Sequence, residues 1–200
     1  YTLSLHDALP ISNGSSFDEV SRPLVLSGHR LYLRRYWTYE RQIDSALRQR
    51  LEQTEPTPFD LPARLAQLFE SGSQPGQVDW QKLACALATR GAFSIITGGP
   101  GTGKTTTVVR LLALLQAPAV EAGRPLRIRL AAPTGKAAAR LTESIGQQVE
   151  RLEVAGEVRD NIPTDVSTVH RLLGSRPGSR HFRHHAGNPL PLDVLVVDEA

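Results

Sequence analysis

The sequence predicts an α/β fold in which a parallel sheet is flanked by helices, preceded by a small, mainly helical module. Two observations support this fold class. After Gly91 the pattern repeats strand, glycine-containing turn and helix, which is typical of parallel sheets with helical crossovers. Before that residue, apolar side chains recur every three or four positions, the period of amphipathic helices. With 200 residues, 40% of them hydrophobic, the chain is long enough to bury a core.

Three segments are expected along the chain. Residues 1–16 form a leader that is disordered or not native to the protein, because they show no clean period and run into a stretch of Ser, Asn and Gly. Residues 17–75 form the N-terminal module, and residues 76–200 form the α/β domain. The chain has no methionine and stops directly after an apolar, strand-like run. We therefore expect a piece of a longer product, truncated within this domain.

The N-terminal part should combine a hairpin with helices. Residues 24–33 predict two short strands around a turn at Ser27-Gly28. Residues 36–51 carry apolar side chains at a spacing of three to four, which predicts a helix with one buried stripe. Two further helices are expected, residues 61–70 and residues 79–90, the second with Asp79 as its N-cap.

The α/β domain is expected to alternate strands and helices. The predicted strands are residues 92–97, 127–132 and 193–197, and the predicted helices are residues 105–115 and 136–152. Ligands of such sheets bind at the carboxyl ends of the strands. We therefore expect the binding and catalytic residues in the segments that follow each strand.

Composition narrows the possible environment and partners. The single cysteine, Cys85, cannot form an internal disulfide, and the longest apolar runs fall far short of the roughly 20 residues of a membrane helix. We expect a cytoplasmic protein without membrane association. The net charge is +3, yet residues 80–140 carry nine basic and one acidic side chain. Such a segment attracts phosphate from a nucleotide or a nucleic acid, although a solvated basic face is the alternative.

A phosphate-binding motif directly follows the first predicted strand. The string Gly98-Gly-Pro-Gly-Thr-Gly-Lys-Thr105 fits G-x-x-x-x-G-K-[ST], with a helix expected after it. Glycines let backbone N–H groups surround phosphates, Lys104 would neutralise the β and γ phosphates, and Thr105 would offer a hydroxyl to Mg²⁺. A glycine-rich turn is the alternative. The predicted ATP-binding residues are Gly98, Gly99, Pro100, Gly101, Thr102, Gly103, Lys104, Thr105 and Thr106.

Two acidic residues end the last predicted strand. Asp198 and Glu199 follow an apolar run, the pattern of a Walker B motif. Asp198 would hold Mg²⁺, directly or through water, and Glu199 would orient and deprotonate the attacking water. With Lys104 they make up the predicted catalytic residues. An apolar run followed by two acids is a weak signal alone, and the upstream phosphate loop strengthens it.

A second glycine motif follows the strand predicted at residues 127–132. Thr134, Gly135 and Lys136 open an alanine-rich helix at the same edge of the sheet, where they could meet a second phosphate chain. The alternative is a helix entry whose small residues pack on the sheet.

These strings resemble superfamily 1 DNA helicases, and within them the family of exodeoxyribonuclease V alpha subunits, RecD. The resemblance covers about residues 22–200 and implies the RecA-like fold of P-loop NTPases. Its elements occur in the family's order: Trp80-Gln81-Lys82, Gly98 to Thr107, Ala131 to Leu141, Ser167 to Gly174, and Asp198-Glu199.

The resemblance also implies roles for individual residues. Gln81 would read adenine, with a polar residue at a helix start as the alternative. Thr134, Gly135 and Lys136 would contact single-stranded DNA, together with Thr168 and His170, although His170 could equally be structural. The nearby cluster of His181, His184 and His185 lacks carboxylates, so we favour a solvated or DNA-facing loop over a metal site.

The implied function is ATP-dependent, 5′ to 3′ movement on single-stranded DNA, as a helicase subunit that acts with RecB and RecC in double-strand break repair and recombination. The N-terminal module would dock on these partners. Such motors need a second RecA-like domain, so this chain alone should bind nucleotide, hydrolyse it poorly and unwind nothing. Two alternatives remain: a stand-alone helicase of the same superfamily, and a nucleotide-binding regulatory module without motor activity.

Overall fold

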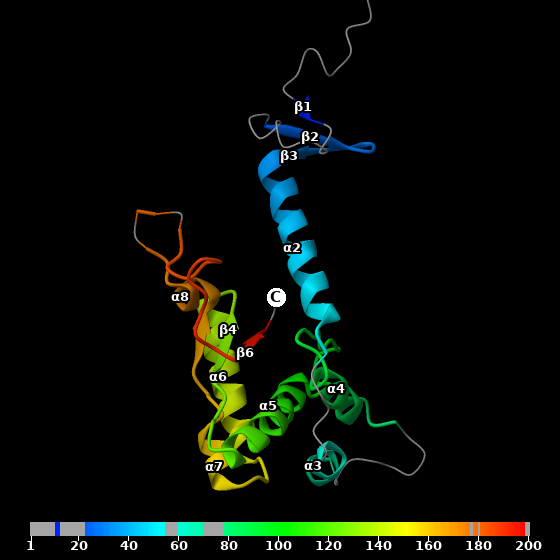
Figure 1. Cartoon of the computed structure of the whole chain (residues 1–200). Helices are drawn as coiled ribbons and strands as arrows, with labels where there is room; N and C mark the ends of the chain where they lie inside the picture. The colour runs from blue at the N-terminus through cyan, green and yellow to red at the C-terminus, as the bar shows by residue number, and fades with distance from the viewer. Residues whose placement is uncertain are drawn as a thin grey trace, which may run out of the picture. The chain divides into compact units, whose positions relative to one another are not determined.

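The computed structural model describes residues 11–12, 23–54, 60–69, 78–176, 178–179 and 181–198. The chain divides into two compact units, residues 1–54 and residues 55–200 (Figure 1). Most of the predicted leader lies outside the described residues. The division of the chain at residue 75 into a docking module and an ATPase domain stays a prediction.

The first unit begins with a small sheet. Strand β2 (Leu24–Ser27) pairs antiparallel with β3 (Arg30–Leu33), which confirms the predicted hairpin. Gly28 in its turn has a φ of 58°, a conformation that glycine adopts without steric strain. A two-residue strand, β1 (Ile11–Ser12), pairs parallel with β2.

Helix α2 (Arg34–Glu52) follows the hairpin and confirms the helix predicted at residues 36–51. The predicted buried stripe is wrong. No residue of α2 is buried, and the side chains of Tyr36, Ile43 and Leu51 are 50, 59 and 63% exposed. Periodicity shows which residues share a face of a helix, whereas burial needs another element on that face. Among the described residues of this unit, only the small sheet β1–β2–β3 is available to pack on α2.

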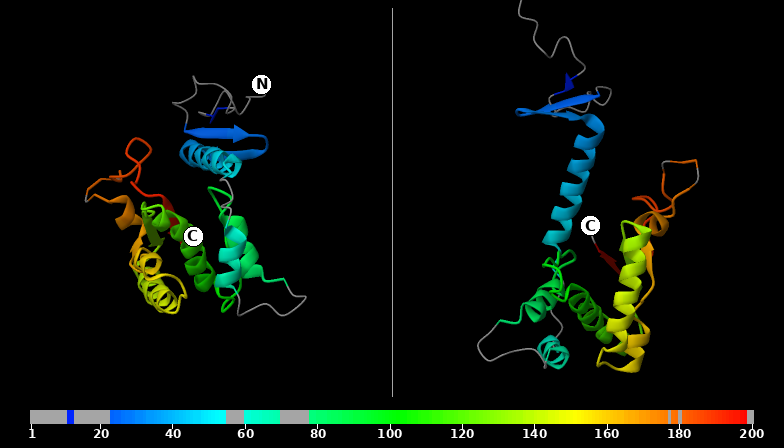
Figure 2. Two further views of the ribbon diagram at one scale, coloured as in Figure 1. Left: turned by 60° about the horizontal axis from the view of Figure 1, so that its bottom comes forward. Right: turned by 180° about the vertical axis from the view of Figure 1, so that it is seen from behind.

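The second unit contains the predicted parallel sheet, in the order β5–β4–β6. Strand β4 (Ile128–Ala132) lies between β5 (Val166–Thr168) and β6 (Val194–Val197). The helices of this unit are α3 (Leu61–Leu68), α4 (Trp80–Ala88), α5 (Lys104–Glu121), α6 (Gly135–Glu150), α7 (Gly156–Asp160) and α8 (Val169–Leu173), as Figure 2 shows from two further sides. The predicted α/β class is confirmed.

The strand predicted at residues 92–97 is not formed. The segment belongs to no described strand, and the side chain of Ile95 is 74% exposed. Extended backbone becomes a strand only when a neighbouring strand accepts and donates its hydrogen bonds. No described strand pairs with residues 92–97. This apolar segment, which the sequence predicts as a buried strand, therefore leads into the phosphate loop without strand pairing.

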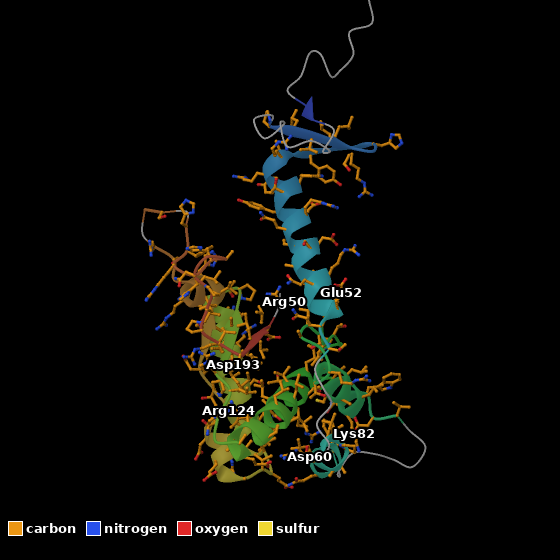
Figure 3. The ribbon with its side chains drawn as sticks, viewed as in Figure 1. Arg50, Glu52, Asp60, Lys82, Arg124 and Asp193 are labelled. Atoms are coloured by element: carbon orange, nitrogen blue, oxygen red, sulfur yellow. The ribbon has the colours of Figure 1, made fainter. Side chains whose placement is uncertain are left out.

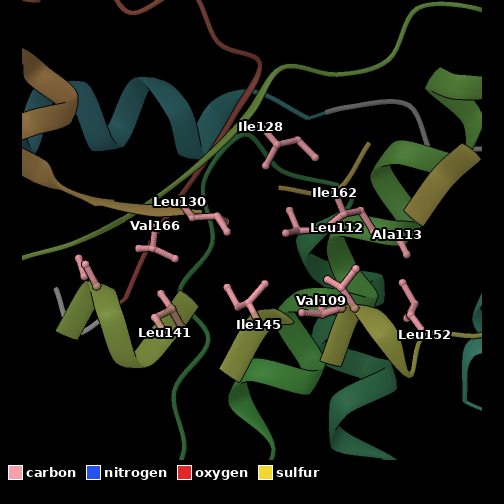
Figure 4. Packing of buried hydrophobic residues seen from close by; sticks show 13 residues of the cluster. Val109, Leu112, Ala113, Ile128, Leu130, Leu141, Ile145, Leu152, Ile162 and Val166 are labelled. Atoms are coloured by element: carbon pink, nitrogen blue, oxygen red, sulfur yellow. The ribbon is translucent and has the colours of Figure 1, made fainter. Parts of the chain in front are cut away.

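The main core of the second unit joins the sheet to α5 and α6. Leu112 on α5, Leu130 on β4 and Ile145 on α6 are at most 1% exposed, and Figure 4 shows them in one cluster. A second cluster joins α3, α4 and α5 through Leu61, Leu65, Phe69, Cys85 and Leu114. Helix α5, which starts at the phosphate loop, therefore packs in both clusters.

A buried carboxamide fixes the far end of α5. Gln116 is fully buried, and its Oε1 accepts a hydrogen bond of 2.8 Å from the backbone N–H of Leu126. Its Nε2 donates to the carbonyl oxygens of Leu126 (3.2 Å) and Asn161 (2.9 Å). The side chain thus satisfies three backbone groups in the segments that lead into β4 and follow α7.

Replacing Gln116 should test this role. Gln116→Leu leaves those backbone groups without a partner, and each unsatisfied buried group costs about 1–3 kcal/mol. We expect the free energy of unfolding to fall by about 2–4 kcal/mol, measured by urea denaturation. The control is Gln147→Leu, which changes an exposed glutamine of α6. Equal stability of the two variants would contradict the structural role of Gln116.

An ion pair joins the residues that directly precede β4 and β6. The guanidinium of Arg127 donates two hydrogen bonds of 3.0 Å to the carboxylate of Asp193, labelled in Figure 3. The backbone N–H of Arg127 donates to the same carboxylate at 2.8 Å, and the N–H of Asp193 donates to the Arg127 carbonyl at 2.9 Å. These bonds lower the pKa of Asp193 from 3.8 to about 2, chiefly through the Arg127 side chain.

The lowered pKa makes this contact sensitive to acid. A carboxyl group whose pKa is lower in the folded state stabilises the fold above its unfolded pKa, and the contribution disappears as the pH falls through the folded value. Wild type should therefore be more stable than Asp193→Asn near neutral pH, and the difference should shrink between about pH 4 and pH 2. Urea denaturation at a series of pH values measures this difference in the free energy of unfolding. A difference that is constant across this range would contradict the assignment.

Candidate nucleotide and nucleic-acid sites

The phosphate loop enters α5 through glycines with left-handed backbone. Gly101 has a φ of 73° and Gly103 a φ of 81°, and Gly103 is the N-cap residue of α5. A Cβ atom on Gly103 would lie 2.5 Å from Nε2 of Gln81, so the end of the Gln81 side chain would have to move. The backbone conformation therefore favours glycine at Gly101 and Gly103, and close approach adds to this at Gly103.

Lys104 closes the loop on itself. Its Nζ donates hydrogen bonds to the carbonyl oxygens of Gly98 (2.7 Å) and Gly99 (2.9 Å), and the hydroxyl of Thr102 also donates to Gly99 (2.9 Å). The arrangement places an ammonium group among the glycines, at the start of a helix of 18 residues. Cationic charge and a helix N-terminus both favour an anion, so these residues fit a phosphate chain.

Helix α4 brings Gln81 to the same loop. The helix begins at Trp80, and its N-cap Asp79 accepts a hydrogen bond of 3.0 Å from the N–H of Lys82, as predicted. Nε2 of Gln81 donates to the carbonyl oxygen of Thr102 at 2.9 Å. The structure therefore places Gln81 beside the phosphate loop, 21 residues away in sequence, while adenine recognition stays a prediction.

Cys85 supports the junction of α4 and α5. Its Sγ donates to the carbonyl oxygen of Thr107 at 3.4 Å, and burial raises the pKa of its thiol to about 12. At ordinary pH the group therefore remains a thiol, and its role is to pack and donate rather than to react as a thiolate.

The carboxyl edge of the sheet gathers the other predicted residues. Thr168 on β5 is the register partner of Ala132 on β4, and the N–H of Asp198 after β6 donates to the Ala131 carbonyl at 3.0 Å. The segments that follow the three strands therefore leave the sheet side by side. Glu199 lies outside the described residues.

Threonine caps start both helices that leave this edge. The Thr134 hydroxyl accepts from the N–H of Ala137 at 3.2 Å at the start of α6, where Gly135 and Lys136 are exposed. The Thr168 hydroxyl accepts from the N–H of Arg171 at 3.2 Å at the start of α8. Both threonines therefore have a structural role beside the DNA contacts that the resemblance implies.

Two residues that the sequence did not single out contact predicted site residues. The hydroxyl of Thr106, in the first turn of α5, donates to Oε1 of Gln148 on α6 at 2.9 Å. The ring of Phe182 meets the exposed ring of His170 edge to face, with centroids 5.8 Å apart. In the sequence, Phe182 could have been selected as a site residue because it is an aromatic residue in a loop of arginines and histidines. No comparable sequence feature distinguishes Gln148.

The described ranges contain neither a candidate metal cluster nor a membrane-spanning helix. There, no group of three His, Cys, Asp or Glu side chains gathers in a way that could hold a metal ion. Within the same residues, no helix combines the length and the apolar character needed to cross a membrane.

Comparison with known proteins defines the class. Residues 81–200 match the AAA domain family, and this match covers more than half of the chain. A glycine loop at a helix N-terminus, in a unit that also contains a parallel sheet, is the expected nucleotide site of such a domain. The chain therefore belongs to the AAA domain family, and this membership implies nucleotide binding.

Similarity to individual proteins narrows the family assignment further. The chain is 46% identical over 178 residues to the RecBCD enzyme subunit RecD of Mycolicibacterium smegmatis, covering 88% of this chain and 30% of that protein. It is 42% identical over 184 residues to the RecD subunit of Haemophilus influenzae, covering 88% and 28%. The ATP-dependent RecD2 DNA helicase of Deinococcus radiodurans is 42% identical over 105 residues, covering 52% and 11%. These matches confirm the resemblance to RecD, and the chain spans less than a third of the length of these three relatives.

The conformation of Gly103 can be tested by substitution. Gly103→Ala places a Cβ against Gln81 and forces alanine into a left-handed backbone, which costs about 1–2 kcal/mol for the backbone alone. We expect the free energy of unfolding to fall by at least that amount in a denaturation experiment. In a Gln81→Ala background the loss should be smaller, because the clash with Nε2 is gone.

Gly146→Ala is the matched control. Gly146 lies in α6, with open space where a Cβ would lie, so alanine should stabilise the helix by about 0.5–1 kcal/mol. A Gly103→Ala variant as stable as wild type would contradict the loop conformation.

Proposed function

We propose that the chain is the N-terminal part of an ATP-dependent DNA helicase subunit of a RecBCD-type complex, which moves 5′ to 3′ on single-stranded DNA in double-strand break repair and recombination. Residues 76–200 are its first RecA-like domain. The observation that carries the proposal is the carboxyl edge of the sheet, where the second glycine motif, Thr168 and Asp198 leave adjacent strands. Similarity to the RecD subunits supports the assignment to this complex.

The nucleotide site is assigned from the loop and the strand ends. Lys104 exchanges its bonds with the Gly98 and Gly99 carbonyls for the β and γ phosphates of ATP. The hydroxyl of Thr105 and the carboxylate of Asp198 hold Mg²⁺, which neutralises charge that develops on the phosphates. Glu199 orients the attacking water and accepts its proton.

The DNA site is assigned to the neighbouring segments. Lys136 and the backbone of Gly135 are exposed at the start of α6, where a helix N-terminus and an ammonium group both favour a phosphate. Thr134, Thr168 and His170 complete the predicted contacts. The capping bonds of the two threonines fix the backbone that would meet the DNA.

Partner docking is assigned to the N-terminal module, residues 17–75. Four large apolar or aromatic side chains of α2 are half exposed or more, which supports a role in binding RecB or RecC in the cytoplasm. A stand-alone helicase is the second candidate, supported by similarity to the RecD2 helicase, although that match covers 52% of this chain against 88% for the two RecD subunits. Co-purification of the full-length product with its partners separates the two.

The activity is tested on the full-length gene product. Single-stranded DNA should stimulate ATP hydrolysis, and Lys104→Ala should abolish the stimulated rate, because no other described ammonium group reaches the loop carbonyls. Arg124→Ala, which removes an exposed charge elsewhere, should leave the rate unchanged. A coupled assay of phosphate release measures the rate of ATP hydrolysis of wild type and of the two variants, with and without single-stranded DNA.

The alternatives give different results. If the protein binds ATP but DNA does not change its rate of ATP hydrolysis, the motor assignment is wrong and the nucleotide-binding regulatory module is the better assignment. Robust unwinding by the 200-residue chain alone would contradict the need for a second motor domain.

A further inference from the structure

Helix α2 carries a row of arginines along one of its sides. Residues 34–52 contain five arginines and three acidic residues. Three of these arginines, Arg34, Arg41 and Arg48, recur every seven residues. Seven residues are close to two helical turns, so these side chains lie on one side of the helix. We call the three arginines, together with Trp37 one turn after the first, the arginine stripe.

The exposed apolar side chains of α2 form a different row. Tyr36, Tyr39 and Ile43 are spaced by three or four residues, and with 3.6 residues per turn this row does not coincide with the arginine stripe. No residue of α2 is buried by the described part of its unit. A protein partner bound to the apolar row therefore does not need the arginine stripe, which is open to another ligand.

The charges of Arg41 and Arg48 are only weakly compensated by the described residues. Arg41 is exposed and takes part in no ion pair there. Arg48 pairs with Asp44 at 2.9 Å, but its side chain is 72% exposed, and such surface pairs contribute at most about 1 kcal/mol. An external anion can therefore compete for both guanidinium groups.

Trp37 supports Arg41 within the stripe. The guanidinium carbon of Arg41 lies 6.0 Å from the centre of the Trp37 ring, at the limit of a cation–π contact. A guanidinium that rests on a ring loses less side-chain freedom when it binds a phosphate. The contact also takes up one face of the aromatic ring in the stripe, so the stripe offers cations for phosphates rather than free rings for bases.

The length and shape of the stripe suit a duplex. At 1.5 Å per residue, Arg34 and Arg48 are about 21 Å apart along the helix axis, the length of about six base pairs of DNA. Figure 1 shows α2 as one straight helix. A straight row of charges matches the stiff backbone of a duplex, whereas proteins that bind single strands combine charges with rings on which bases stack.

We propose that the arginine stripe of α2 binds the phosphate backbone of duplex nucleic acid without sequence preference. Arg34, Arg41 and Arg48 contact phosphates along the duplex, and Trp37 holds Arg41 in position. The inference goes beyond the proposed function, because this site belongs to the first unit and takes a duplex, whereas the strand-end site belongs to the second unit and takes a single strand.

The test compares two doubly substituted full-length proteins of equal charge. Arg41→Gln with Arg48→Gln changes the stripe. The matched control, Arg35→Gln with Arg50→Gln, changes two arginines of the same helix that lie outside the stripe and donate hydrogen bonds to neighbouring residues. Fluorescence anisotropy with a labelled duplex, closed at both ends by short loops, measures affinity at several salt concentrations. Thermal melting checks the fold.

The stripe variant should lose both affinity and salt dependence. Each lost phosphate contact lowers the salt-dependence slope for a duplex by about 0.9, so we expect a decrease of about 1.8. The affinity should fall at least about fivefold, whereas the control should keep the slope and affinity of wild type. Equal losses in the two variants would overturn the stripe, because they would reflect general attraction by positive charge.

A labelled oligothymidylate separates duplex from single-strand binding. The stripe variant should bind this oligonucleotide as wild type does. If it loses as much affinity for the oligothymidylate as for the duplex, the assignment to a duplex is wrong. If it binds the duplex like wild type, the stripe has no part in nucleic-acid binding.

The outcomes separate this inference from the proposed function. If the stripe variant loses duplex binding but single-stranded DNA does not stimulate ATP hydrolysis by wild type, the stripe stands and the motor does not. If single-stranded DNA stimulates ATP hydrolysis while both double variants bind the duplex alike, the motor stands and the stripe does not.

Discussion

The strands β4, β5 and β6 run in one direction, and this parallel pairing places every candidate residue after a strand at the same edge. At the start of the sheet, Arg127 and Asp193 hold β4 and β6 in register through side-chain and backbone hydrogen bonds. At the other end, the N–H of Asp198 bonds to Ala131. A register shift of one residue would turn alternate side chains to the opposite face. It would bury the polar strand ends or expose the core, so the site and the core depend on the same pairing.

Helix α6 carries the proposed DNA site at its first residues and contacts the phosphate-loop helix α5 near its last residues. Helix α5 begins at Lys104 and α6 begins after Thr134, and they share the main core. The hydrogen bond between Thr106 and Gln148 links the first turn of α5 to α6. Packed helices move as units rather than bending locally. This contact ties the first turn of α5 to the last turn of α6, at the opposite end of that helix from Gly135 and Lys136.

Sequence reasoning succeeded where the signal is local. The alternation of helices and strands from residue 104 onward, the Asp79 cap and the left-handed glycines of the motif depend on neighbouring residues, and these features form. It failed where burial depends on a distant partner: the face of α2 is exposed, and residues 92–97 belong to no described strand. The contacts of Gln81 with Thr102 and of Thr106 with Gln148 span 21 and 42 residues. No periodicity encodes such pairs, because they arise from the packing of helices.

The phosphate loop also shows how a binding site is kept in shape before its ligand arrives. The ammonium of Lys104 is satisfied by two loop carbonyls, and Gln81 holds the carbonyl of Thr102. These bonds replace water around groups that would otherwise be unpaired in a tight turn. A triphosphate must displace the lysine from neutral carbonyl oxygens, and it offers charged oxygens in return. The bonds of the Lys104 ammonium are charge-assisted with either partner, and a phosphate adds the Coulomb attraction between opposite full charges, which favours the exchange.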